Sequence, residues 1–98
     1  MEALLEKIRV ADQVTWRRWL HQHAELSFEE FETTAYIENL LRDVPNLTIE
    51  RPAPTGLVAT LYGAHPGKTI ALRADIDALP MDELADVPYK SINPGVMH

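Results

Sequence analysis

The chain has 98 residues and a formal net charge of −6, with nine basic residues against fifteen acidic ones. This length excludes multi-domain machinery, and the acidic balance argues against nucleic acids and anionic membranes as partners, because both bind through phosphate neutralisation. The absence of cysteine excludes disulfides and thiolate zinc sites within the chain, and no signal-peptide pattern or apolar run of roughly 18 residues is present, so we expect a cytoplasmic protein.

Apolar residues repeat at helical spacing near the N-terminus and predict an amphipathic helix over about 3–22. His21 and His23 fall at its end. Two residues along a helix correspond to about 200°, so one helix cannot place both rings on one ion. We expect these histidines to cap the C-terminal end of the helix, with Glu25 as a nearby partner.

A second helix is predicted over about 28–43. Ser27 and Glu30 have the spacing of a capping box, which would begin the helix. Pro45 prevents its continuation. Large aromatic side chains at helical spacing usually pack in a core, so we expect four of them there, namely Trp16, Trp19, Phe28 and Phe31.

After Pro45 the apolar spacing changes to two, which predicts three short strands over about 47–50, 57–62 and 69–74. Residues 65–68 place proline and glycine in the middle of a type II turn that would join the second and third strands as a hairpin. The predicted fold is therefore α/β, with two N-terminal helices followed by a small three-stranded sheet around one modest core. No sustained period follows from 79 to 98, so we expect an extended loop there, either functional or lacking a packing partner.

Asp75 and Asp77 follow the most apolar predicted strand, where two carboxylates two residues apart point the same way while the chain stays extended. Carboxylates at such a strand end can bind a cation, orient a metal-bound histidine or exchange a proton. The alternative is that Asp75 ends the strand and Asp77 forms an Asx-turn. Arg73 could neutralise Asp75 or a substrate carboxylate, or could protect a strand edge. His98 has no partner in its own neighbourhood.

Four blocks stand in order along the chain, at 19–30, 55–61, 68–80 and 93–98. Together they resemble the start of the M20 peptidase family, in the amidohydrolase branch that includes hippurate hydrolases and N-acetyldiaminopimelate deacetylases. The Arg-Ala-Asp-x-Asp-Ala-Leu-Pro block is the most distinctive. Ala24 stands where the family has proline.

The resemblance implies that residues 1–98 form the N-terminal part of a three-layer α/β/α catalytic domain that hydrolyses N-acyl amino acids. It implies two divalent metal ions (Zn, Mn, Co or Ni), with the ligands beyond His98 and none within the chain. Asp77 matches an aspartate expected to orient a metal ligand. Asp75 would form the active-site wall, and Arg73 is a candidate for substrate binding.

Two functional hypotheses remain. In the first, the chain is part of a metal-dependent amidohydrolase and is inactive alone, because the cysteine and histidine ligands and the catalytic glutamate of the family are absent. In the second, it is a non-catalytic interaction module whose open sheet edge drives self-association to a homodimer or larger oligomer.

Overall fold

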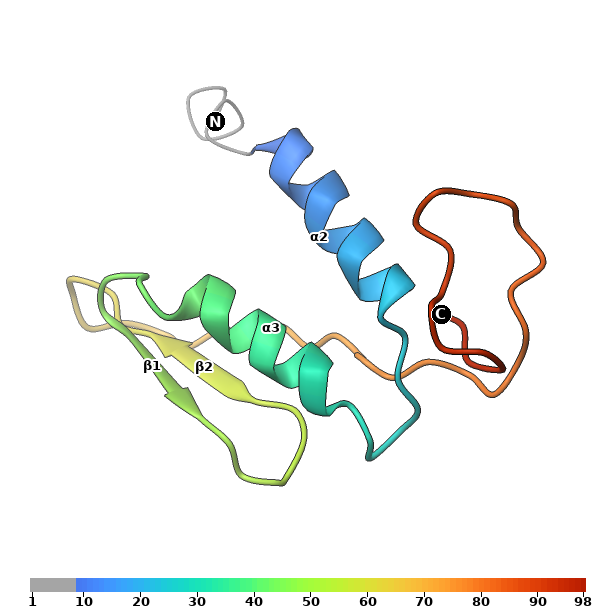
Figure 1. The fold of residues 1–98 in the computed structure, drawn as a ribbon. Coiled ribbons are helices and arrows are strands. Elements are labelled where there is room, and N and C mark those ends of the chain that lie inside the picture. Colours follow the sequence, from blue (N-terminus) through green and yellow to red (C-terminus); the bar gives the residue numbers. More distant parts are fainter. Residues whose placement is uncertain (1–8) are drawn as a thin grey trace.

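The computed structural model describes residues 9–98, which form two helices and a two-stranded sheet. Their order along the chain is α2 (Val10–Gln22), α3 (Phe31–Leu41), β1 (Leu47–Glu50) and β2 (Val58–Leu61). Figure 1 shows α3 lying between α2 and the hairpin of β1 and β2. The predicted α/β class is confirmed, with two strands in place of three.

α2 ends at Gln22, as the periodicity predicts, and the first part of the predicted helix, before residue 9, lies outside the described residues. The backbone N–H of His23 donates to the Trp19 carbonyl at 3.0 Å, and the ring Nδ1 lies 2.8 Å from the same oxygen. Because a carbonyl only accepts, Nδ1 carries the proton. The capping role predicted for His23 is confirmed.

α3 begins at Phe31, three residues later than predicted. Phe28 has a φ of 67°, in the left-handed region, so the chain cannot be helical there. Glu30 occupies the N-cap position, but its side chain makes no capping hydrogen bond. The predicted capping box of Ser27 and Glu30 is therefore wrong.

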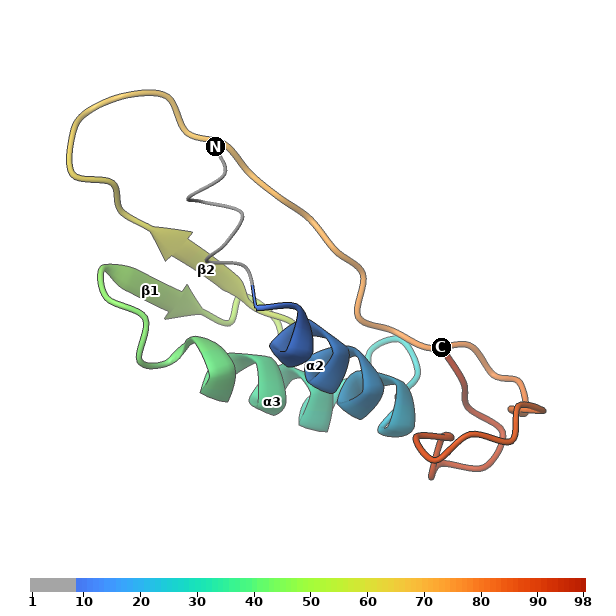
Figure 2. The same ribbon diagram turned by 90° about the horizontal axis from the view of Figure 1, so that it is seen from above.

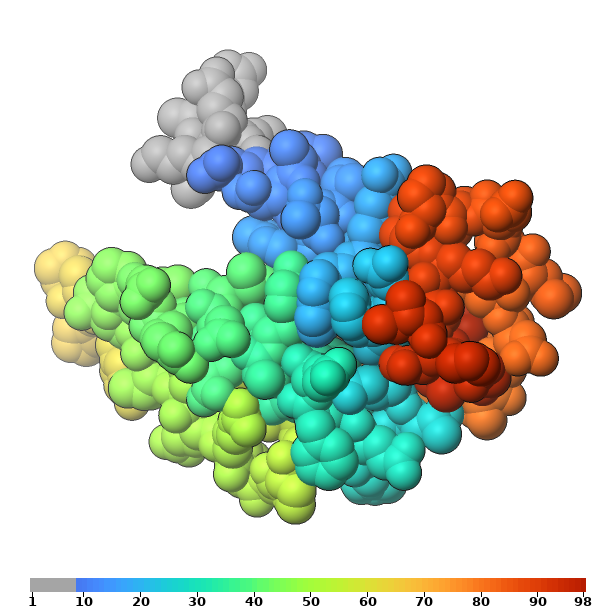
Figure 3. All heavy atoms as spheres, viewed as in Figure 1, coloured from blue at the N-terminus to red at the C-terminus, as the bar shows by residue number. Residues whose placement is uncertain are grey.

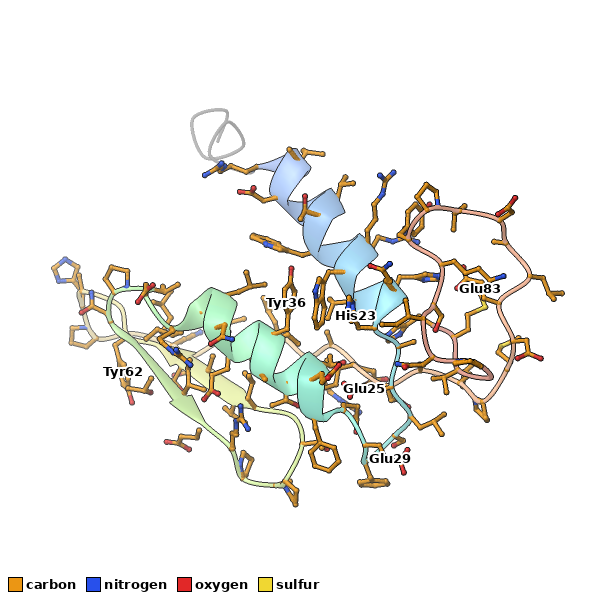
Figure 4. The ribbon with its side chains drawn as sticks, in the orientation of Figure 1. His23, Glu25, Glu29, Tyr36, Tyr62 and Glu83 are labelled. Atoms are coloured by element: carbon orange, nitrogen blue, oxygen red, sulfur yellow. The ribbon has the colours of Figure 1, made fainter. Side chains whose placement is uncertain are left out.

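Glu25 caps α3 instead. Its Oε1 accepts a hydrogen bond from the backbone N–H of Thr33 at 2.7 Å, and its Oε2 accepts one from the N–H of Glu32 at 3.2 Å. These N–H groups have no partner within the helix, and a carboxylate also interacts favourably with the positive end of the helix dipole. The turn between the helices brings Glu25 to this end of α3 (Figure 4).

The aromatic ring of Trp19 joins the two helices. It stacks on His23 at a centroid distance of 3.9 Å and on Tyr36 of α3 at 3.7 Å. Trp19 is half-buried in this stack, but Trp16, Phe28 and Phe31 are exposed. The predicted aromatic core is therefore wrong for three of its four members.

The hairpin joins the first two predicted strands, whereas the sequence predicted a hairpin of the second and third. β1 and β2 pair antiparallel, with Leu47 opposite Leu61 and Glu50 opposite Val58. These strands lie within the predicted ranges 47–50 and 57–62, which are confirmed.

The third predicted strand, 69–74, is not formed. Its backbone makes no hydrogen bond with any part of residues 9–98, and Figure 2 shows it as an extended trace apart from β2. Gly67 lacks the positive φ that the predicted type II turn requires. Strand propensity describes how side chains fit a sheet, and it does not supply the neighbouring strand.

The described residues bury few apolar side chains. Ala24 and Ala78 are the only buried apolar residues among residues 9–98, and Ile70 and Leu72 are 86% and 97% exposed. The accessible surface is 8157 Å², against roughly 5,600 Å² expected for a closed domain of this mass. The radius of gyration is 15.8 Å, against about 13 Å for a compact domain of similar length. The modest hydrophobic core expected from the sequence is not found within residues 9–98, and these residues do not confirm the three-layer arrangement implied for the complete domain.

Residues 79–97, hereafter the C-terminal loop, contain no helix or strand, as predicted, but they are closed at their base. The N–H of Leu79 donates to the Met97 carbonyl at 2.8 Å, and the N–H of Met97 donates back at 3.0 Å. Figure 3 shows the loop as a lobe against the end of α2. Neither helix of the described segment is long and apolar enough to cross a membrane.

Candidate active-site wall

The segment that carries the aspartates is held against the turn after α2. The N–H of Ala78 donates to the Glu25 carbonyl at 2.7 Å, and Leu26 and Ala78 form a parallel bridge. From the other side, the Asn93 side chain donates to the Ala24 carbonyl at 2.8 Å. The turn therefore connects the aspartate segment with the C-terminal loop.

Arg73 and Asp75 form an ion pair in which Nη2 lies 3.0 Å from Oδ1. This is the neutralising contact that the sequence allowed. The two side chains are 90% and 71% exposed, and exposed pairs of this kind contribute little to stability. The pair therefore leaves Arg73 accessible to another anion.

Asp75 and Asp77 line the same cavity, of about 370 Å³, together with Ser27 and Glu30. Asp75 also borders a larger cavity of about 640 Å³. Residues of α2 and of the segment 97–98 also line this larger cavity, among them Trp16, Arg17, His21, Met97 and His98.

His98 lies close enough to His21 and Asp77 for both residues to shift its pKa. Its ring centroid is 6.4 Å from that of His21. Desolvation of the ring and the nearby His21 lower the pKa of His98 below its ordinary value of 6.5, whereas the negative charge of Asp77 opposes this shift. The structure thus brings Asp77 into the electrostatic neighbourhood of His98, a residue that the sequence left without a partner.

The sequence missed the partner of His21. Its Nε2 lies 2.8 and 2.9 Å from the two carboxylate oxygens of Glu83, 62 positions away. The expected pairing with Glu25 is wrong, because the Glu25 carboxylate caps α3. No local pattern could have identified Glu83, since its contact with His21 depends on the path of the C-terminal loop.

Glu83 is nearly enclosed, with 3% of its side chain exposed. The hydrogen bond from His21, followed in importance by one from the backbone N–H of Ser91 at 3.0 Å, lowers the pKa of Glu83 below its ordinary value of 4.5. Desolvation opposes this shift. The ionised carboxylate is therefore the form that this environment favours.

The donor set does not amount to a metal site. Among residues 9–98, no three histidine, aspartate or glutamate side chains converge so that they could hold an ion. We therefore assign no residue of this segment as a metal ligand. Its aspartates can orient or polarise a neighbouring group, and its cavity can border a substrate.

No protein-family model matches the chain. The chain is 41% identical over all of its 98 residues to the N-acyl-L-amino acid amidohydrolase of Geobacillus stearothermophilus, of which it covers 26%. It is 56% identical over 82 residues to an uncharacterized hydrolase of Staphylococcus aureus, a match that covers 84% of this chain and 21% of that protein.

Two solved structures share its fold. The Bacillus subtilis YxeP protein, described as a dinuclear metal-binding peptidase of the M20 family, matches 90% of this chain and 25% of its own, with a TM-score of 0.82 and 41% identity. A structure from methicillin-resistant Staphylococcus aureus matches 87% of this chain and 23% of its own, with a TM-score of 0.81 and 44% identity. The chain spans about a quarter of the length of these relatives. Its homologues and structural neighbours are thus M20-family amidohydrolases and peptidases, which confirms the family resemblance of the sequence.

Proposed function

We propose that the chain forms one wall of the active site of a metal-dependent hydrolase that cleaves the amide bond of N-acyl amino acids. The observation that carries this proposal is the 41% identity, over all 98 residues, with an N-acyl-L-amino acid amidohydrolase. Because the chain covers 26% of that relative, we propose the activity for the complete product of the gene. Residues 1–98 alone are expected to be inactive.

Within this function, we assign Asp77 the role of orienting a metal ligand. Its charge acts at His98, and carboxylates that hydrogen-bond to metal ligands commonly fix the orientation of those ligands. Asp75 borders both cavities and forms part of the wall. Arg73 is exposed, and its planar fork can pair with the carboxylate of the amino-acid substrate.

Two divalent metal ions (Zn, Mn, Co or Ni) are part of the proposal for the complete protein, with ligands outside residues 9–98. The support is the dinuclear metal binding described for the Bacillus subtilis neighbour. Such ions would activate water and polarise the amide carbonyl.

The test is amino-acid release from N-acetyl and N-benzoyl amino acids by the complete gene product, before and after chelation and metal restoration. We expect activity that chelation removes and a divalent metal restores. Asp77→Asn should lower kcat by about tenfold or more, whereas Asp86→Asn, an exposed carboxylate change in the C-terminal loop, should leave it unchanged. A metal-replete protein that releases no amino acid from this panel would contradict the proposal.

A second candidate function, self-association without catalysis, is favoured by the unpaired segment 69–74. Ile70 and Leu72 are almost fully exposed, and Leu72 borders a cavity of about 410 Å³ against α3 and β2. A second copy could cover this apolar surface. Light scattering of the 98-residue chain at tens of micromolar should then show a dimer or larger species that Leu72→Lys disrupts, and a stable monomer would count against it.

A further inference from the structure

The hydrogen-bonded pair of His21 and Glu83 links the side chains of α2 to the first part of the C-terminal loop. Both carboxylate oxygens lie within 2.9 Å of the His21 Nε2. The carboxylate accepts this hydrogen bond, so Nε2 is the donor. The two side chains are 15% and 3% exposed, so water competes weakly for this contact.

Neighbouring side chains pack around this pair and add positive charge near it. The edge of Tyr89 lies against His21 at a centroid distance of 5.9 Å and an interplanar angle of 80°. The guanidinium of Arg18 lies 4.6 Å from the centre of the Tyr89 ring. Lys90 adds positive charge near Glu83. The pair is thus surrounded by side chains from α2 and from the second half of the loop, and Figure 4 shows Glu83 in the loop beside the end of α2.

A short series of hydrogen bonds runs from this pair to the end of the chain. Glu83 Oε2 accepts the N–H of Ser91 at 3.0 Å, and the Ser91 hydroxyl donates to the Val96 carbonyl at 2.7 Å. The next residue, Met97, closes the loop against Leu79. The position of the segment that ends in His98 therefore depends on where Glu83 is held.

We propose that Glu83 and His21 are positioning residues that fix Met97 and His98 at the cavity beside Asp75. The inference rests on the proposed function, in which this cavity belongs to the active site. Glu83 itself does not line the cavity, so it acts through His21 and through the hydrogen bonds of Ser91. Misplacement of reacting groups by about 1 Å can cost roughly a hundredfold in rate. A link that positions the cavity wall can therefore affect the reaction rate.

The first measurement is amide hydrogen exchange in the complete gene product, followed in peptides that cover 87–97 and α3. In Glu83→Gln, we expect the 87–97 peptide to exchange about tenfold faster, because its hydrogen bonds open locally, with α3 within about twofold of the parent. Glu83→Asp, which keeps the charge, should recover part of the protection. Asp86→Asn is the matched loss of a carboxylate in the same loop and should change neither peptide.

The second measurement separates positioning from general destabilisation. Glu83→Gln should lower kcat for an N-acyl amino acid by about tenfold while KM changes by less than about threefold, and Glu83→Asp should restore part of kcat. Unchanged exchange in the 87–97 peptide, or equal acceleration in α3, would overturn the positioning role. If the parent protein shows no amidohydrolase activity, the proposed function fails, and the exchange result still decides whether the pair holds the loop.

Discussion

A single carboxylate oxygen of Glu25 accepts two hydrogen bonds from Thr33, one from the backbone N–H and one from the hydroxyl, each at 2.7 Å. Thr33 is completely buried, so neither of these donors can turn to water instead. The contact joins the turn after α2 to the first turn of α3. It thus ties the end of α2 to the start of α3. The N–H of Ala78, in the aspartate segment, donates to the backbone carbonyl of the same Glu25.

Replacing Glu25 by alanine should therefore destabilise the fold. We expect a loss of about 1–2 kcal/mol in the free energy of unfolding, in the upper part of the range of about 0.5–2 kcal/mol for lost N-caps, because two buried donors of Thr33 lose their acceptor. Urea unfolding of the 98-residue chain followed by circular dichroism measures the change. Glu29→Ala, at an exposed neighbour, should stay within about 0.5 kcal/mol, and equal effects of the two variants would contradict the capping role.

Gly56 has a backbone conformation that favours glycine over other residues. It has a φ of 79° with nothing within 4 Å of an added Cβ, and its N–H donates to the buried hydroxyl of Thr34 at 2.8 Å. Gly56→Ala should cost about 1 kcal/mol through backbone strain alone. Gly67→Ala is the matched control, because Gly67 also has open space around it but lacks the positive φ. Thermal unfolding that shows equal losses for both variants would refute this explanation.

The lowered pKa of Glu83 predicts how the free energy of unfolding depends on pH. Because its pKa is lower in the folded chain than its ordinary value of 4.5, its contribution to stability is fully present above about pH 4.5 and is lost as the pH falls through the lowered pKa. The difference in unfolding free energy between the parent and Glu83→Gln should therefore shrink toward acid. Urea unfolding between pH 7 and pH 3 measures it, with Asp86→Asn as the control. A difference that stays constant over this range would show that the charge of Glu83 is not involved.

The negative charge of Asp77 should raise the pKa of His98. Desolvation and His21 lower the pKa of this imidazole below 6.5, and Asp77 raises it, so Asp77→Asn should lower it further. The Cε1 proton of His98, followed by NMR from pH 4 to pH 8, reports the midpoint. Because the folded pKa is the lower one, the contribution of His98 to stability falls as the pH drops through 6.5. An unchanged midpoint in Asp77→Asn would show that the two residues do not interact.

The elements that the sequence predicted correctly depend on neighbours a few residues apart. The apolar repeat that ends at Gln22, the cap of His23 on Trp19, and the strands within 47–50 and 57–62 all require only local spacing and local hydrogen bonds. The four ordered motifs likewise predicted the resemblance to M20-family proteins that the relatives and structural neighbours confirm, since the motifs are properties of the residues themselves.

What the sequence alone determined is therefore the helical and strand periodicities, the acidic character and the resemblance to M20-family proteins. The tertiary structure decided which partners meet. Glu25 rather than Ser27 caps α3, Glu83 rather than Glu25 binds His21, and residues 69–74 remain unpaired within the described chain. The physical reason is that a carboxylate or a strand edge is satisfied by whichever group the fold brings within hydrogen-bonding distance. In this chain, the group that reaches His21 lies 62 positions away.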